Sequence, residues 1–298
     1  MNFVNRVFLE RRRIENLKDL MRRFKRNKMA LMGAVVVLFW LLVALFASSM
    51  APHDPFKGKL FHRLLPPAWA EGGNPSYLLG TDHMGRDILS RILYGSRISI
   101  LIGTTVVFIT TTIGIIFGLI AGFYGGKIDA VISRVVDILL AFPYLVFAIG
   151  MMAVMGPGIF NLMLALIYKE WVTSCRVVRG EVLAIKKTEY IDAARAIGVR
   201  NAVIMFKEIL PNVLSPVIVV STLRVATIII MEASLSFLGL GIQPPTPAWG
   251  SMVSEGRSYL FGFWWISTFP GLAILMLVMG INLMGEGLRD ALDPRLKE

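Results

Sequence analysis

Cysteine and histidine are nearly absent from this chain. It has one cysteine, Cys175, and three histidines among 298 residues. A single thiol excludes an internal disulfide and a metal site built from cysteines. The histidines share one segment with two aspartates, but the spacing matches no pattern of metal ligands, so we expect solvated loop residues and no metal site. These five residues are His53, Asp54, His62, Asp82 and His83.

Motifs for nucleotide binding or covalent catalysis are also lacking. No glycine-rich loop ends in Gly-Lys-Ser or Gly-Lys-Thr, the sequence that holds nucleotide phosphates. The pair Gly125-Gly126 predicts only a turn. Cys175 and Ser174 have no neighbouring histidine to activate them, which argues against an intramembrane enzyme. We therefore expect no catalytic residue and no cofactor in this chain.

Charged residues are few, and the hydrophobic residues occur in blocks. Charged residues make up 17% of the chain, against about 25% in soluble domains. Hydrophobic residues make up 55%, and uncharged runs are long enough for helices that cross a bilayer. We predict an all-α polytopic membrane protein with about six spans. Their ranges are 29–50, 99–123, 137–155, 159–178, 212–231 and 264–284, the third and fourth being separated by a turn at Gly156-Pro157-Gly158.

The basic residues predict how the chain is oriented. The net charge is +11, but Lys and Arg lie between the hydrophobic runs and not on one soluble face, so nucleic-acid binding is not expected. Residues 1–28 contain ten of them. With that end in the cytoplasm, 22 basic residues lie inside and seven outside, so both termini are predicted to be cytoplasmic and the protein to be a multi-pass cell-membrane protein. Residues 14–24 form either a basic amphipathic helix on the inner leaflet or a solvated tail.

The cytoplasmic segment at 181–211 predicts two short helices. Thr188 can cap a helix whose first turn contains Glu189 and Asp192, and Gly198 can end it in a left-handed conformation. Asn201 can cap a second helix that stops at Leu210, before Pro211. A short helix with a small-residue surface, held between two turns, is suited to docking in a cleft of another protein. The residues predicted to contribute are Glu189, Tyr190, Asp192, Ala193, Ala194, Arg195, Gly198, Leu210 and Pro211.

This segment and three others carry a family resemblance. Asp192-Ala193-Ala194, Gly198 and the Ile209-Leu210-Pro211 end resemble the "EAA" loop of ABC importer permeases, with Asp where Glu is usual. Segments 79–97, 232–250 and 283–294 resemble the C-type permease subunits of dipeptide and oligopeptide importers. The resemblance covers nearly the whole chain from about residue 22.

The resemblance implies a type I ABC importer permease fold, with a basic N-terminal helix (1–28), a first span with an outer segment (29–97) and a permease core (98–298). It also implies a complex with a homologous sister permease, two ATPase subunits that bind ATP and magnesium, and an extracytoplasmic binding protein. The cargo would be di- or oligopeptides, although related systems carry nickel chelates, antimicrobial peptides or sugars. An ion-coupled secondary transporter is the alternative class, but no internal repeat supports it.

Ionisable residues inside the spans are candidates for the translocation pathway. They are Lys169, Glu170, Arg224 and Glu232. Such residues usually face the protein interior or a wet cavity. Lys169 or Arg224 could attract the carboxylate of a passing peptide, or Arg224 and Glu170 could form an ion pair between helices.

Three other features have local interpretations. Gly114, Gly118, Gly122 and Gly126 recur every four residues, which predicts close helix packing either against the sister subunit or within this one. Pro143 predicts a kink in the third span. Segment 82–97 reads as a separate amphipathic helix on the outer surface, with its arginines away from the apolar face.

Overall fold

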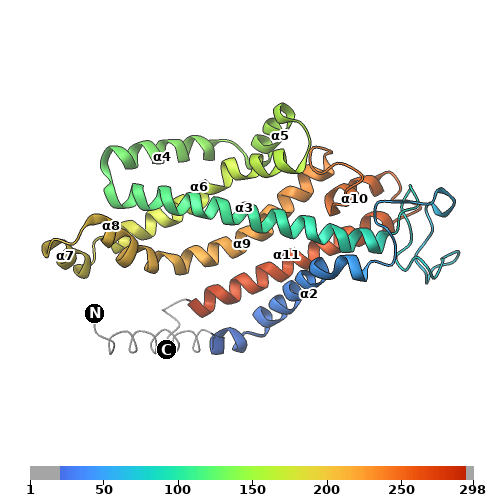
Figure 1. Cartoon of the computed structure of the whole chain (residues 1–298), viewed down its shortest axis with the longest axis horizontal. Coiled ribbons are helices and arrows are strands. Elements are labelled where there is room, and N and C mark those ends of the chain that lie inside the picture. The colour runs from blue at the N-terminus through green and yellow to red at the C-terminus, as the bar shows by residue number, and fades with distance from the viewer. Residues whose placement is uncertain (1–20, 293–298) are drawn as a thin grey trace.

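The computed structural model describes residues 21–292, most of which lie in helices running lengthwise beside one another (Figure 1). The long helices are α2 (Lys28–Met50), α3 (Ile88–Tyr124), α6 (Ile159–Ile185), α9 (Leu210–Phe237) and α11 (Trp265–Leu292). The shorter elements are η1 (Leu60–His62), α4 (Gly126–Ala141), α5 (Tyr144–Met155), α7 (Glu189–Ala196), α8 (Asn201–Val203), the π-helical turn η2 (Ile204–Ile209) and α10 (Trp249–Arg257). The part of the chain that is described contains no β-strand, only an isolated bridge between Thr81 and Asp87. The predicted all-α class is confirmed.

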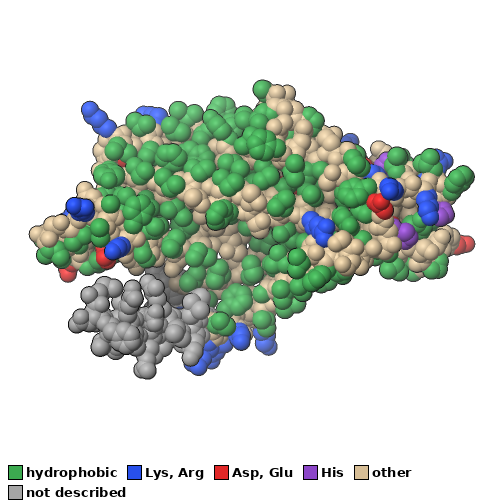
Figure 2. All heavy atoms as spheres, in the orientation of Figure 1, with side chains coloured by type: hydrophobic (Ala, Val, Ile, Leu, Met, Phe, Trp, Pro, Cys, Tyr) green, Lys and Arg blue, Asp and Glu red, His purple; other side chains and the backbone are tan. Residues whose placement is uncertain are grey.

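The two ends of the helical bundle differ in what they carry. Helix α7 lies at one end, and the segment from residue 51 to 87 lies at the other, beyond α10 (Figure 1). The start of α2 and the end of α11 meet, because Asn27 Nδ2 donates to Asp290 Oδ2 at 3.3 Å. Hydrophobic side chains cover the middle of the visible face, while Lys, Arg and His lie mainly toward the ends (Figure 2). This distribution is that of a protein embedded in a bilayer.

Helices occupy all six predicted spans, although not all are equally apolar. Four helices within residues 21–292 are long and apolar enough to cross a membrane unaided: α2, α3, the continuous stretch Asn201–Phe237, and α11. The bent pair α4 and α5 brings this number to five if the pair is counted as one broken span. The predicted fourth span lies within α6, which is long enough but contains Lys169, Glu170 and Arg176. Such a helix needs protein or water around its charged residues. Those of α6 contact the Phe142 carbonyl, Arg224 of α9 and Asp137 of α4.

The glycine ladder explains how α6 packs on α3. A Cβ atom added at Gly114, Gly118 or Gly122 would lie within 3.0 Å of a side chain of α6. The three side chains met are Ser174, Val178 and Val182, in that order. Only glycine allows the two backbones to approach this closely. Of the two predictions for these glycines, packing within this chain is what the structure shows, and contact with a sister subunit stays a prediction. Gly126 meets nothing within 4 Å.

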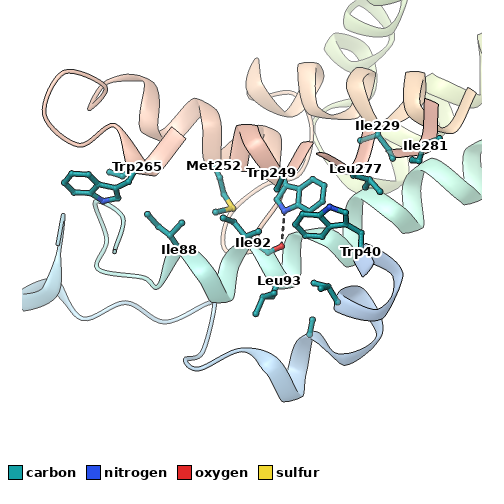
Figure 3. Packing of buried hydrophobic residues seen from close by; sticks show 14 of the residues in the cluster. Trp40, Ile88, Ile92, Leu93, Ile229, Trp249, Met252, Trp265, Leu277 and Ile281 are labelled. Carbon is teal, nitrogen blue, oxygen red and sulfur yellow. Dashed lines mark hydrogen bonds between the residues drawn. The ribbon is translucent and has the colours of Figure 1, made fainter. Parts of the chain in front are cut away.

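The half of the bundle away from α7 is organised around two tryptophans. Trp40 and Trp249 pack edge to face with centroids 4.9 Å apart, within a cluster drawn from α2, α3, α9, α10 and α11 (Figure 3). The indole N–H of Trp249 donates to the carbonyl of Ile92 at 2.9 Å (Figure 3). Its ring fills the space left by Gly95, where a Cβ would lie 2.7 Å from Cδ1. Helix α10 is thereby fixed to the N-terminal end of α3.

Segment 82–97 is not a separate interfacial helix. Residues 88–97 are the first ten residues of α3, and residues 82–87 form a turn closed by the Thr81–Asp87 bridge. Arg86 and Arg91 are buried, at 6% and 1% exposure. The predicted amphipathic surface helix was wrong because these arginines pair with carboxylates, one of them distant in the sequence.

The third predicted span is broken and not merely kinked. Helix α4 ends at Ala141, α5 begins at Tyr144, and the two axes differ by 88°. Phe142 and Pro143, both with extended ψ values, form the break, which we call the elbow. Proline cannot continue the helical hydrogen-bond ladder, so the predicted position of the bend is confirmed, but a single helix over 137–155 is wrong.

Only the end of the predicted N-terminal amphipathic helix lies within the described residues. Residues 21–26 are helical, and the Asn27 side chain then caps α2 by accepting from the backbone N–H groups of Met29 and Ala30. The rest of that prediction, and the tail beyond Leu292, lie outside the described part of the chain.

Candidate functional site

Helix α7 matches the first short helix predicted for the cytoplasmic segment, and Ile191 and Ala194 pack it against the bundle. Ile191 is fully buried in a cluster that includes Ile204 and Ile209. The other side chains of α7 are exposed or half-buried; they are Glu189, Tyr190, Asp192, Ala193, Ala194, Arg195 and Ala196. One face of the helix therefore packs against the bundle, while most of its surface stays accessible.

The end of α7 is as predicted, but its start differs in detail. Gly198 has φ +78°, and the N–H of Val199 donates to the carbonyl of Ala194 at 3.1 Å, as in a glycine-terminated helix. Thr188 occupies the cap position, but its hydroxyl donates to the carbonyl of Ile185 and does not cap α7. Arg195 forms an ion pair with Asp192 at 3.3 Å and lies 5.8 Å from the centre of the Phe123 ring.

The second predicted short helix does not stop at Leu210. Arg200, not Asn201, occupies the cap position, and the helix continues from Asn201 through η2 into α9. The N–H of Leu210 donates to the carbonyl of Met205, five residues back, so the π-helical turn shifts the hydrogen-bond register just before Pro211. Pro211 lies in the first turn of α9. The segment after α7 is thereby continuous with a spanning helix.

Two apolar side chains near α7 were not predicted as functional. Ile197 is 81% exposed and lies one turn beyond Ala193 and Ala194, on the face that also includes Tyr190. Phe206, in the adjacent η2, is 58% exposed. Large apolar residues in an otherwise charged segment were a usable signal. We call Tyr190, Ala193, Ala194, Ile197 and Phe206 the α7 surface.

Charged residues at membrane depth form a second cluster, at the elbow. The ammonium of Lys169 donates to the carbonyl of Phe142 and lies 5.7 Å from the Tyr144 ring and 5.9 Å from the Phe147 ring. Glu170 follows Lys169 in α6, and its carboxylate oxygen Oε1 lies 3.4 Å from Nε of Arg224 in α9. The predicted ion pair between α6 and α9 is therefore present.

Glu232 is separate from that cluster. It is fully buried, and its two carboxylate oxygens accept from the hydroxyls of Ser99 at 3.2 Å and Ser236 at 2.9 Å. Ser99 belongs to α3, so the carboxyl group joins α9 to α3. The structure does not bring Glu232 to an accessible surface, which makes it a poor candidate for cargo contact.

A third group of charged residues lies at the end of the bundle opposite α7 and was not predicted from the sequence. Arg86 contacts Asp82 at 2.6 Å and Glu255 at 2.7 Å, and Arg91 contacts the same two residues at 3.6 and 3.3 Å. His83 has a ring nitrogen within 4.8 Å of the ligand atoms of Asp82 and Glu255. Two guanidinium groups already neutralise these carboxylates, which opposes cation binding there. The network instead fixes α10 to the start of α3.

The comparisons with known proteins agree with this arrangement. Residues 114–298 match the family described as binding-protein-dependent transport system inner membrane component, and residues 16–67 match the N-terminal transmembrane domain of oligopeptide transport permease C. The dipeptide transport system permease of Escherichia coli is 47% identical, with 95% of this chain and 94% of that protein covered. The di/tripeptide transport system permease of Pseudomonas aeruginosa is 44% identical, with 94% and 93% covered.

The oligopeptide transport system permease of Bacillus subtilis is 39% identical, covering 94% of this chain and 90% of that protein. Among solved structures, the inward-facing MetNI methionine ABC transporter superposes with a TM-score of 0.56 at 20% identity, covering 68% of this chain and 97% of that one. That likeness shows the type I ABC importer permease fold. This multi-pass membrane protein therefore belongs to the family of inner-membrane components of binding-protein-dependent transport systems.

Proposed function

We propose that this chain forms one half of the membrane channel of an ABC importer for di- or oligopeptides. Three relatives named as dipeptide, di/tripeptide or oligopeptide permeases cover more than nine-tenths of it, which supports the peptide cargo. A homologous sister permease would complete the channel, two ATPase subunits would bind ATP and magnesium, and an extracytoplasmic binding protein would deliver the peptide. ATP hydrolysis is assigned to those partners because this sequence has no phosphate-binding loop.

The observation that carries this proposal is the construction of α7. The helix is eight residues long, held by one fully buried isoleucine and ended by a left-handed glycine, so it can move only with the elements beneath it. The small side chains of Ala193 and Ala194 allow another protein to approach the helix backbone closely. We infer that an ATPase subunit docks on the α7 surface.

Transmission then follows from the connections of α7. Three residues, 186–188, join α7 to α6, and residues 201–209 continue helically into α9. Closure of the ATPase pair would shift α7, and both spanning helices would have to follow. In this proposal α7 lies in the cytoplasm. The start of α2 and the end of α11 lie toward the same end of the bundle as α7 (Figure 1), which supports cytoplasmic termini.

The proposal is tested by uptake of a radiolabelled dipeptide into proteoliposomes that contain the full complex. We expect uptake that requires ATP and all partners and that vanadate inhibits. Ala194→Asp, which adds charge and bulk to the docking face, and Gly198→Val, which strains the φ +78° turn, should abolish uptake without affecting membrane insertion. Gly262→Ala, at an outer glycine with no atom within 4 Å, is the matched control. Full uptake by both α7 variants, or uptake by the chain alone, would refute the proposal.

A further inference from the structure

Arg224 has a partly exposed cationic group in the middle of a membrane-spanning helix. Its side chain is 35% exposed, although α9 crosses the membrane and Arg224 lies well inside it. A guanidinium group stays charged at any relevant pH. Lipid does not solvate such a group, so a partly exposed arginine at this depth faces water or another protein.

The other ionisable groups nearby are occupied or inaccessible. Lys169 is 6% exposed and bound to the Phe142 carbonyl and two aromatic rings. Glu232 lies two turns farther along α9, about 12 Å away by helical rise, and both of its oxygens accept from serine hydroxyls. Of the two cations that the sequence offered for cargo contact, only Arg224 is accessible.

The contact between Arg224 and Glu170 leaves part of the guanidinium free. The closest pair of atoms is Nε of Arg224 and Oε1 of Glu170, at 3.4 Å, and Oε1 of Glu170 is buried without a hydrogen bond from any residue in 21–292. Over the same range, Arg224 forms no ion pair with another carboxylate. The outer edge of the guanidinium, with its two Nη atoms, makes no hydrogen bond to Glu170, which is its carboxylate neighbour among the described residues. That edge is the one that binds carboxylates through two parallel hydrogen bonds.

We propose that Arg224 is a transient binding site for the carboxylate of the cargo, on a water-filled pathway beside α6 and α9, with Glu170 as the counterion that orients it. This inference rests on the proposed function, because it takes the cargo to be a peptide. Every unmodified peptide has a C-terminal carboxylate, so one guanidinium recognises the cargo whatever its side chains. Glu170 already neutralises part of the charge, which weakens binding and allows release.

The first experiment measures access and ligand class directly. It uses the complete transporter in nanodiscs, without binding protein and in a Cys175→Ala background. The labelled position is Thr227, which is half-buried and lies one turn from Arg224 on α9. The variant Thr227→Cys is treated with a neutral, water-soluble thiol reagent. We expect the introduced cysteine to be labelled. Millimolar dialanine should slow the labelling rate at least threefold, whereas dialanine amide should not slow it. Adding Arg224→Gln should remove the difference. Leu38→Cys, on an exposed face of α2, is the lipid-facing control and should not be labelled.

Any of three results would overturn the inference: no labelling of the Thr227→Cys variant, equal protection by acid and amide, or acid-specific protection that persists in Arg224→Gln. None of these three labelling results depends on ATP hydrolysis or on import. They are therefore distinguishable from failure of the proposed function, which would appear as absent ATP-dependent uptake in the wild type.

A second experiment separates recognition from a structural ion pair. The double variant Glu170→Gln/Arg224→Gln removes both charges of the pair, so neither side chain is left charged without the other. A purely structural pair predicts that this double variant imports free-acid peptide at the wild-type rate, which would refute our proposal. We expect instead at least a fivefold rise in KM for the free acid, with a kcat within twofold of the wild type.

Discussion

Replacing Gly118 by alanine tests whether the glycine ladder joins α3 to α6 within one subunit. The added Cβ would lie 2.6 Å from Cβ of Val178 and 2.7 Å from the carbonyl oxygen of Cys175. Neither atom can rotate away, because one belongs to the backbone and the other is attached directly to it. The two helices must separate by several tenths of an ångström, which loses dispersion contacts along their interface.

The size of the destabilisation follows from comparison with another glycine of these two helices, one that has free space around it. Gly180 in α6 meets nothing within 4 Å, so Gly180→Ala gains only helix propensity, up to about 1 kcal/mol. Gly118→Ala gains the same amount but also overpacks the interface, at about 1–3 kcal/mol. The difference between the two variants isolates the packing cost, and we expect it near the upper end of that range.

The assay is thermal unfolding of the purified protein in mild detergent, followed by tryptophan fluorescence. Each kcal/mol should lower Tm by about 2–4 °C in a chain of this size. Val178→Ala should not rescue Gly118→Ala, because it leaves the Cβ that makes the closest contact. Equal Tm values for Gly118→Ala and Gly180→Ala would refute the assignment of this ladder to α6.

Two further variants probe the ends of the molecule. Ile191→Ala removes the fully buried side chain of α7 and should destabilise the attachment of the helix by about 2–5 kcal/mol. We expect faster proteolysis of segment 186–200 with little change in global Tm; unchanged proteolysis would contradict the assignment of Ile191 as the main anchor. Glu255→Gln leaves Arg91, 1% exposed, with only Asp82 as a carboxylate partner and should cost about 3–5 kcal/mol in unfolding, whereas Glu71→Gln, at an exposed site, should leave Tm unchanged.

Features encoded by neighbouring residues could be predicted from the sequence. Helix α7 ends where Gly198 allows a left-handed turn, and the elbow lies at Pro143, because both effects act within a few residues. The uncharged runs likewise determined where the long helices lie. Even the pairing of Arg224 with Glu170 was available as an alternative, because a buried charge needs a partner.

Features that depend on distant residues could not be predicted. Arg86 and Arg91 looked like the polar face of a surface helix, but their partner Glu255 lies more than 160 residues away. The ladder at Gly114–Gly122 predicted close packing without naming the helix opposite. The elbow bends by 88° where a proline alone suggested a kink. Lys169 of α6 binds the Phe142 carbonyl at the break and so stabilises the sharp turn.

Helix α6 connects the proposed docking surface to the proposed cargo site. At its C-terminal end it leads into α7. Along its C-terminal half it packs against the glycines of α3, and near its middle Lys169 contacts the elbow and Glu170 contacts Arg224. Because the packing on α3 leaves no free space, α6 can tilt together with α3 but cannot slide past it. A displacement of α7 would therefore reach the elbow and Arg224 as a rigid-body movement, altering the guanidinium's surroundings in the same step that reorients the channel.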